Sequence, residues 1–141
     1  MPYTRILVHV VWATKVRKKL LTTKNRHRLF VHIRDYSSSK DIHLLEINGF
    51  TDHVHCLISV SPNQNIASIV QLLKGESSFW ANKHLEFPEK FSWQNDYFAV
   101  SVSQSHEAVV RNYIRNQEFH HSKKSFEEEY QAFIAKYGFS E

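Results

Sequence analysis

The sequence predicts an α+β fold of the ferredoxin-like, or split βαβ, type: an antiparallel sheet with helices on one face, plus a C-terminal helix that bears a tyrosine. Short apolar segments indicate strands, and segments with apolar residues at helical spacing lie between them. The predicted order is strand, helix, strand, strand, helix, strand, followed by two more helices. No internal repeat or Gly/Ser linker interrupts this order, so we expect one domain over residues 1–141.

The first strand is predicted over Arg5 to Thr14, because apolar residues on both alternating faces are typical of a central strand covered on both sides. A helix follows, with Thr22 or Thr23 as its N-cap, and the segment "SSSKD" ends it. Its apolar residues at helical spacing are Leu29, Phe30, Ile33 and Tyr36.

A hairpin is predicted next, with strands over Ile42 to Phe50 and His53 to Val60 and a turn over Gly49 to Asp52. The segment "SPNQN" opens the second helix. The apolar stripe of that helix consists of Ile66, Ile69, Val70, Leu73 and Trp80.

The fourth strand, over Tyr97 to Val102, completes a predicted core of about residues 1–102. The helix that bears the tyrosine is predicted over about residues 104–121. A last helix is predicted over about residues 125–138 and ends at Gly138, because glycine commonly follows the last turn of a helix.

The composition indicates the compartment. Hydrophobic residues make up 42% of the chain, yet the apolar runs are too short for a membrane span, and no secretory leader is visible. Cys56 is the single cysteine, which excludes an intrachain disulfide and favours a reducing compartment. We therefore expect a cytoplasmic protein without membrane contact.

The basic residues point to a polyanionic partner. The formal net charge is +4, a balance that favours nucleic acid. A basic cluster directly follows the first strand, and two arginines open the next segment. These residues are Lys15, Arg17, Lys18, Lys19, Arg26 and Arg28. A cluster at one strand end can contact a phosphate backbone, although a solvated loop explains the pattern equally well.

Two histidines with one valine between them lie in the third predicted strand. Because strand side chains alternate, His53 and His55 share one side with Leu57, while Cys56 faces the opposite side. Two imidazoles at this spacing can reach a common metal ion. The alternative is hydrogen bonding within the core, and a metal site needs a third ligand from elsewhere in the chain.

The predicted tyrosine helix offers that ligand. Tyr113 and Gln117 are four residues apart and therefore share one helical face. We expect the same face to include His106, Val110 and His120 or His121. A buried tyrosine with a polar tip is the alternative reading. His9 and Glu46 lie in mid-strand and are candidates to orient a metal-binding histidine, with ordinary core hydrogen bonding as the alternative.

Five segments together resemble a known family. The segments are "VHVVWATKVRKKLL", "DHVHCLISV", "IASIVQLLKGESSFWANK", "WQNDYFAVSVS" and "NYIRNQ". In this order they resemble the HUH-type single-tyrosine transposases of the insertion-sequence 200/605 family, in which HUH denotes His-hydrophobic-His. The resemblance covers nearly the whole chain.

The resemblance implies a ferredoxin-like core and a DNA transposase that cleaves and rejoins single-stranded DNA. It implies that His53, His55 and Gln117 bind Mg²⁺ or Mn²⁺, and that Tyr113 is the nucleophile that forms a 5′-phosphotyrosine and frees a 3′-OH. A phenol has a pKa of about 10, so a nearby cation or base must help it to ionise.

The resemblance also implies partners. These are single-stranded DNA with a hairpin near the end of the element and a second copy of the chain, in a bacterial-type cytoplasm with the nucleoid as the site of action. Lys74 joins the basic residues above as a candidate DNA contact, with Trp80 or Trp93 as a stacking surface. The chain lacks a G-x-x-x-x-G-K-[ST] loop, so we expect no nucleotide cofactor.

Three alternatives remain open at this point. A domesticated relative that cuts or binds chromosomal hairpin repeats would keep the same catalytic residues. A non-catalytic module that binds DNA hairpins would keep the fold alone. A replication initiator or relaxase would share the histidine pair, although these proteins are usually larger and often carry paired tyrosines.

Overall fold

The computed structural model describes residues 3–121 and 125–137 and contains a four-stranded antiparallel sheet with the order β2-β3-β1-β4. The strands are β1 (Leu7–Ala13), β2 (His43–Gly49), β3 (His53–Ser59) and β4 (Phe98–Val102). The first and third strands are neighbours at the centre, as the predicted ferredoxin-like fold requires. The prediction of an antiparallel α+β fold is therefore confirmed.

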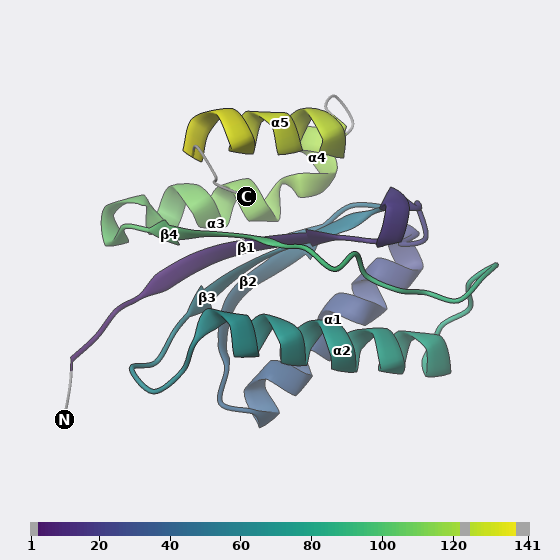
Figure 1. The fold of residues 1–141 in the computed structure, drawn as a ribbon, viewed down its shortest axis with the longest axis horizontal. Coiled ribbons are helices and arrows are strands. Elements are labelled where there is room, and N and C mark those ends of the chain that lie inside the picture. Colours follow the sequence, from purple (N-terminus) through teal and green to yellow (C-terminus); the bar gives the residue numbers. More distant parts are fainter. Residues whose placement is uncertain (1–2, 122–124, 138–141) are drawn as a thin grey trace.

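Helices cover both faces of this sheet, as Figure 1 shows. On one face lie α1 (Thr23–Ser39) and α2 (Ile66–His84). On the other face lie α3 (Glu107–Arg115), α4 (Gln117–His121) and α5 (Phe126–Tyr137). Two short 3₁₀ turns precede helices, η1 (Lys15–Arg17) after β1 and η2 (Gln104–His106) after β4.

The helices on the first face begin where the sequence places their caps. The side chain of Thr22 accepts a hydrogen bond from the backbone N–H of Asn25 at 3.3 Å. Asn65, the last residue of "SPNQN", accepts one from the N–H of Ser68 at 2.9 Å. Each cap satisfies a backbone donor that the first helical turn leaves without a partner.

The main hydrophobic core lies between the sheet and the helix pair α1 and α2. Three residues of β3 belong to it: Val54, Cys56 and Ile58. On the opposite face of the same strand, Leu57 packs against Ile114 of α3. The predicted alternation is confirmed, and it directs His53 and His55 toward the helices that follow β4.

The single helix predicted over residues 104–121 is interrupted in the structure. Residues 104–106 form η2, and Asn116 separates α3 from α4 with φ −98° and ψ 20°. The side-chain amide of Asn48 donates a hydrogen bond to the carbonyl of Arg115 at 3.0 Å. This bond satisfies a carbonyl at the break, which a continuous helix would pair internally.

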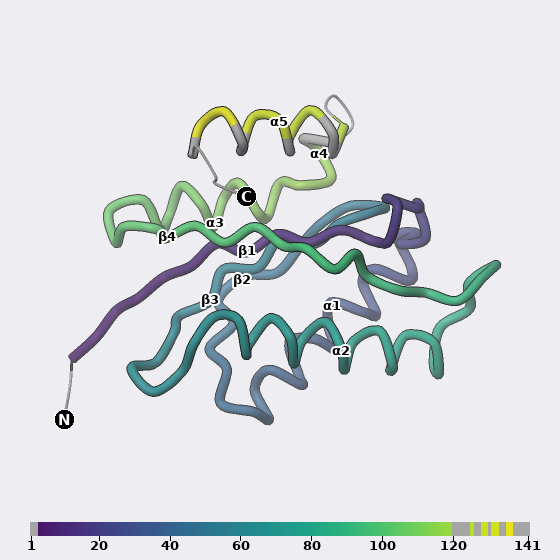
Figure 2. Tube along the Cα trace, in the orientation of Figure 1, coloured from purple at the N-terminus to yellow at the C-terminus, as the bar shows by residue number. Residues whose placement is uncertain are grey.

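Figure 2 shows the path of the chain after β4, where α3 lies along the sheet and α5 returns on the side of α3 that faces away from α1 and α2. The C-terminal helix is thus brought back over the middle of the sheet. Across residues 3–121 and 125–137, no helix combines the length and the apolar character that a membrane crossing requires.

Candidate active site

The Nδ1 atom of each of the paired histidines is hydrogen-bonded to another side chain. His53 and His55 are both 0% exposed. Nδ1 of His53 donates to Oδ1 of Asp52 at 2.8 Å, and Nδ1 of His55 shares a hydrogen bond of 2.8 Å with Nε2 of His9. With each Nδ1 engaged, both Nε2 atoms face the helices above the sheet, and such bonds fix the orientation of metal-binding imidazoles.

His9 therefore lies where the sequence made it a candidate for orienting a histidine. The pKa of His9 is lowered to about 3, chiefly by burial and in smaller part by the charge of His55, while Glu129 acts in the opposite sense. His9 is consequently neutral at physiological pH. Glu46, the other candidate, bonds instead to the guanidinium of Arg115, with Nε of Arg115 at 2.8 Å from Oε1.

Gln117 meets the first histidine. It is 0% exposed, and its Oε1 lies 3.2 Å from Nε2 of His53. Its amide nitrogen donates to the backbone carbonyl of Tyr113 at 3.4 Å. The carboxamide is thus turned so that its oxygen, the atom able to bind a cation, faces the imidazole.

Tyr113 lies beside the second histidine and is half-buried. Its ring stands edge-on to that of His55, with 5.6 Å between ring centroids and an interplanar angle of 79°. Its hydroxyl donates a hydrogen bond to Oε2 of Glu129. The structure thus brings the phenol, the carboxamide and both imidazoles together within one chain.

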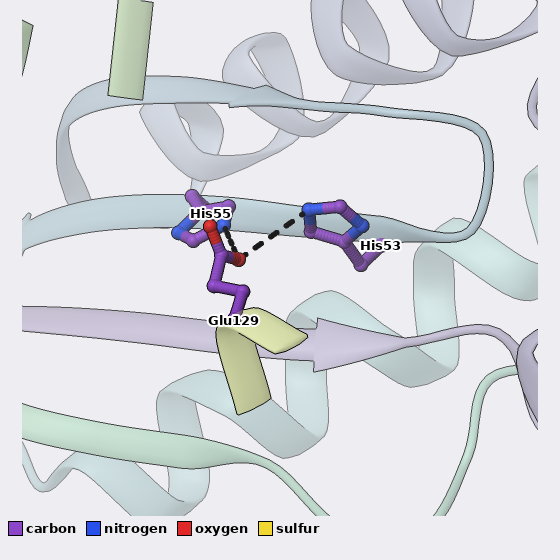
Figure 3. A group of neighbouring side chains, drawn as sticks. All are labelled: His53, His55 and Glu129. Carbon is purple, nitrogen blue, oxygen red and sulfur yellow. Dashed lines mark hydrogen bonds and ion pairs between the residues drawn. The ribbon is translucent and has the colours of Figure 1, made fainter. Parts of the chain in front are cut away.

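Glu129 of α5 completes this group, and the sequence analysis missed it. It is 4% exposed, and its Oε1 lies 2.9 Å from Nε2 of His55 and 3.7 Å from Nε2 of His53. Figure 3 shows its side chain reaching from α5 toward both rings. A signal existed in the sequence: Glu129 lies three residues after Phe126 and four before Phe133, so it shares the face of an apolar stripe.

The cluster fits a divalent metal ion. One ligand atom each from His53, His55 and Glu129 lie within 4.8 Å of one another, and all three residues are buried. Imidazole nitrogens suit transition metals, whereas carboxylate and amide oxygens suit Mg²⁺ and Mn²⁺. Oε1 of Gln117 lies beside Nε2 of His53, so the candidate ligands comprise two imidazole nitrogens, a carboxylate and an amide oxygen.

Ion pairs hold α3 and α4 over the histidines. Arg115 bonds to Glu46 of β2, as described above. Arg26 of α1 donates from Nη2 to Oε1 of Glu118 at 2.8 Å and from Nη1 to the carbonyl of Leu21 at 3.1 Å. These contacts anchor the residues on either side of the break at Asn116, and thereby the position of Gln117.

Two of the candidate DNA contacts have internal partners instead. Arg26 is 4% exposed, and its guanidinium bonds to Glu118 and to a backbone carbonyl. Lys74 donates from Nζ to the carbonyls of Asn95 and Asp96 at 2.9 and 3.2 Å, and to that of Gln94. The structure therefore gives both residues a role in holding other segments in place, and their contact with phosphate stays a prediction.

The other basic candidates lie near the surface. Lys15, Lys18, Lys19 and Arg28 are exposed and Arg17 is partly exposed. Lys18 forms an ion pair with Glu89, at a distance of 2.5 Å. All of them except Arg28 follow β1 directly, at the end of the sheet where His53 begins β3.

Three aromatic or imidazole candidates differ from expectation. Trp93 is 7% exposed, with its ring edge-on to that of Trp12 at 5.9 Å, so it offers little surface for stacking. Trp80 is partly exposed but stacks on His32 at 4.1 Å. His106 is exposed and bonds to Ser103, because the break into η2 turns it away from the site. The side chains of His120 and His121 lie outside the described residues.

Known proteins resemble this chain over most of its length. Residues 2–117 match the family described as "Transposase IS200 like". The ISDra2 transposase TnpA of Deinococcus radiodurans is 30% identical over 116 residues, which cover 77% of this chain and 81% of the relative. A crystal structure of a putative transposase from Deinococcus radiodurans R1 matches with a TM-score of 0.65 and 30% identity, over 82% of this chain and 93% of that one.

A second solved structure, a REP-associated tyrosine transposase bound to a REP hairpin, matches with a TM-score of 0.63. Its identity is 14%, over 86% of this chain and 72% of that one, so this likeness concerns the fold alone. The match to the family covers the sheet, α1, α2 and α3, and ends at Gln117. By that match and by the similarity to the ISDra2 transposase, the chain belongs to the IS200-like family of transposases.

Proposed function

We propose that this chain cleaves and rejoins single-stranded DNA at the ends of an insertion sequence through a covalent 5′-phosphotyrosine intermediate on Tyr113. The observation that carries this proposal is the meeting of one phenol and two imidazoles at the carboxylate of Glu129, with the carboxamide of Gln117 beside His53. Membership of a transposase family supports DNA as the substrate.

The proposed step is a transfer of one phosphodiester bond. The hydroxyl oxygen of Tyr113 attacks the phosphorus, the bond from phosphorus to the 3′ oxygen breaks, and that oxygen leaves and takes up a proton. Oε2 of Glu129 already accepts the hydrogen bond of the phenol, so it is placed to receive the phenolic proton. Attack by a 3′-OH on the phosphotyrosine reverses the step, and no nucleotide is consumed.

We assign the divalent ion to His53, His55 and Gln117, with Glu129 as a neighbour or further ligand. The donor set described above supports this assignment, and we take Mg²⁺ or Mn²⁺ from the resemblance to the 200/605 family. When bound, such an ion polarises the scissile phosphate and stabilises the charge that develops on it. Asp52 and His9 would hold the two imidazoles in the required orientation.

We propose a DNA hairpin near the cleavage site as the partner. The REP-hairpin complex of a structural neighbour supports this class of ligand, and Lys15, Arg17, Lys18, Lys19 and Arg28 are the proposed backbone contacts.

We also propose a homodimer that acts on the bacterial nucleoid. β4 is an edge strand, which is a ready surface for pairing. Light scattering after size exclusion would measure the mass of the assembly.

The central test is covalent capture of DNA. The protein is incubated with Mn²⁺ and labelled single-stranded DNA that tiles both flanks of its own gene, and the products are separated on a denaturing gel. We expect an adduct with the wild-type chain and none with Tyr113→Phe, because the phenylalanine lacks the attacking oxygen. Tyr36→Phe, which alters a partly buried tyrosine of α1, is the matched control and should retain the adduct.

Two results would count against the proposal. An undiminished adduct in Tyr113→Phe would assign the nucleophile elsewhere. Tight binding of the flank DNA by the wild-type chain, without any adduct in Mg²⁺ or Mn²⁺, would favour the non-catalytic hairpin-binding module instead.

A further inference from the structure

Three neighbouring hollows surround residues 92–95, at the end of the sheet where β1 leads into η1. The largest has a volume of about 670 Å³ and lies between residues 15–17 and 92–96. The second, of about 500 Å³, lies between α2 and residues 92–97, and the third, of about 410 Å³, lies between residues 15–20 and 89–92. Ser92 borders all three, and we refer to the three hollows together as the groove.

This groove is attached to the candidate active site. Ala13 pairs in register with His53, and the next residue, Thr14, donates from its N–H to the carbonyl of Asp52 at 2.8 Å. The hydroxyl of Thr14 also donates to the carbonyl of Lys18 at 2.7 Å. From strand geometry, the backbone of Lys15 lies roughly 10 Å from that of His53. A DNA strand held at the active site would therefore reach the hollow beside Lys15 within a few nucleotides. The hollow along α2 lies on the face of the sheet opposite to α3, so the strand would reach it by passing around this end of the sheet.

The turn at the rim of the groove is strained and presents an apolar side chain. Val16 has φ 48° and ψ 27°, and Arg17 has φ 55°, both in the left-handed region. This conformation is uncommon for any residue with a side chain and a clear outlier for a β-branched one. Val16 is nevertheless 71% exposed, so burial does not offset the strain. Strain of this kind tends to persist where the conformation serves a function.

The lining of the largest hollow combines two cations and two side-chain amides with one carboxylate, that of Asp96. Lys15 and Arg17 line the largest hollow. Gln94 and Asn95 line it as well, and their side chains form no hydrogen bond with any residue that the structure describes. Lys74 bonds to the carbonyls of residues 94–96 and so fixes the backbone of this wall. The backbone of this wall is thus held by Lys74, while its side-chain amides remain available.

We propose that this groove binds the single-stranded DNA that flanks the scissile bond and reads its bases. Lys15 and Arg17 contact phosphates, the amides of Gln94 and Asn95 bond to base edges, and Val16 packs against a base. Amide side chains match the donor and acceptor pairs of bases, and exposed apolar side chains are used by DNA-binding proteins as wedges between bases. This inference rests on the proposed function, since it takes single-stranded DNA as the substrate.

The test measures binding alone. Fluorescence anisotropy follows labelled dT, dA and dC homopolymers of about 20 nucleotides, a length that spans such a groove. EDTA is present so that cleavage does not contribute. Lys15→Ala should lower the slope of log affinity against log salt by roughly 0.7, the value for one phosphate contact on a single strand. Lys83→Ala removes the same charge from an exposed position of α2 outside the groove and should leave the slope unchanged.

Base reading is tested by the double variant Gln94→Ala/Asn95→Ala. It should reduce the differences in affinity among the three homopolymers while keeping the salt slope of the wild type. Val16→Gly should weaken binding to all three by about fivefold, near the lower end of the cost of losing one base contact. Its Tm should stay the same or rise, because glycine adopts positive φ without strain. Val16→Asn, which also tolerates this conformation, should weaken binding similarly.

The proposal is overturned if Lys15→Ala and Lys83→Ala have the same salt slope, or if the double variant leaves the homopolymer preferences of the wild type intact. Equal affinity of Val16→Gly and wild type would show that Val16 does not pack against a base. These results are separable from those of covalent capture. Groove variants that behave like wild type while the adduct forms would refute the groove alone, whereas a confirmed groove without an adduct would refute the chemistry on Tyr113 alone.

Discussion

The hydroxyl of Tyr113 donates a hydrogen bond to Oε2 of Glu129, which lies 16 positions further along the chain on a different helix. The other oxygen of the same carboxylate lies 2.9 Å from Nε2 of His55. One carboxylate thus joins the proposed nucleophile to the histidine pair. Because the family match ends at Gln117, this contact is made by a segment beyond the matched region.

Replacing Glu129 by glutamine should weaken binding of Mn²⁺ about tenfold, since the variant keeps the shape of the side chain but loses its negative charge. Calorimetric titration of the protein with Mn²⁺, and the rise in Tm that Mn²⁺ produces, measure the effect. EDTA should remove the rise in both proteins. Glu128→Gln, at the exposed neighbouring position, is the control and should bind as the wild type does. Equal affinity in both variants would place Glu129 outside the metal site.

His9 should make stability depend on pH. Its pKa is lowered to about 3 in the folded chain, first by burial, against 6.5 when it is free. Between these values the unfolded chain binds the additional proton, so the free energy of unfolding should fall as the pH decreases below 6.5. One such group contributes at most about 1.4 kcal/mol per pH unit.

The comparison that isolates His9 uses denaturant unfolding in EDTA between pH 4 and pH 7. His9→Gln carries no titrating ring and should show a shallower dependence than the wild type. His106→Gln removes an exposed imidazole and should follow the wild-type curve. Parallel curves for wild type and His9→Gln would mean that His9 takes up its proton equally easily in the folded and unfolded chains.

Arg26→Ala should loosen α4 and the position of Gln117. The guanidinium of Arg26 is buried and bonds to Glu118, which is itself part-exposed, so we expect a loss of about 1 to 2 kcal/mol in the free energy of unfolding. Hydrogen exchange at the amides of residues 117–119 should accelerate more than exchange in β3. Arg28→Ala, on the exposed side of the same helix, should change neither quantity. Unchanged exchange in Arg26→Ala would show that α4 is held by other contacts.

Cys56 should resist thiol reagents while the chain is folded. It is 0% exposed within the main core, and burial raises the pKa of its thiol far above the usual range, so little thiolate exists to react. The absorbance change with a disulfide reagent should appear only on unfolding in denaturant. Rapid reaction of the native chain would place Cys56 nearer to the surface than the structure does.

Much of the fold followed from local patterns. The alternation in β3 placed His53 and His55 on the face away from the main core. The four-residue spacing predicted that Tyr113 and Gln117 turn toward the same place, which they do from α3 and α4. Thr22 and Asn65 cap the helices that they were expected to open. Such features depend on side-chain period and backbone donors within a few residues, which a sequence displays directly.

Other features depend on contacts that no local pattern encodes. Glu129 reaches His55 across 74 positions, and Arg26 meets Glu118 across 92, so burial and charge pairing at these sites arise only once α4 and α5 have folded back over the sheet. The same return gave Arg26 an internal partner in Glu118, and the bond from Asn48 to Arg115 marks the break in the predicted tyrosine helix. The sequence by itself determined which elements form and which way the two imidazoles face. The tertiary structure decided that Glu129 completes their site. Its carboxylate and the ring of His55 are far apart in the sequence, and burying either one is costly unless folding also brings its partner.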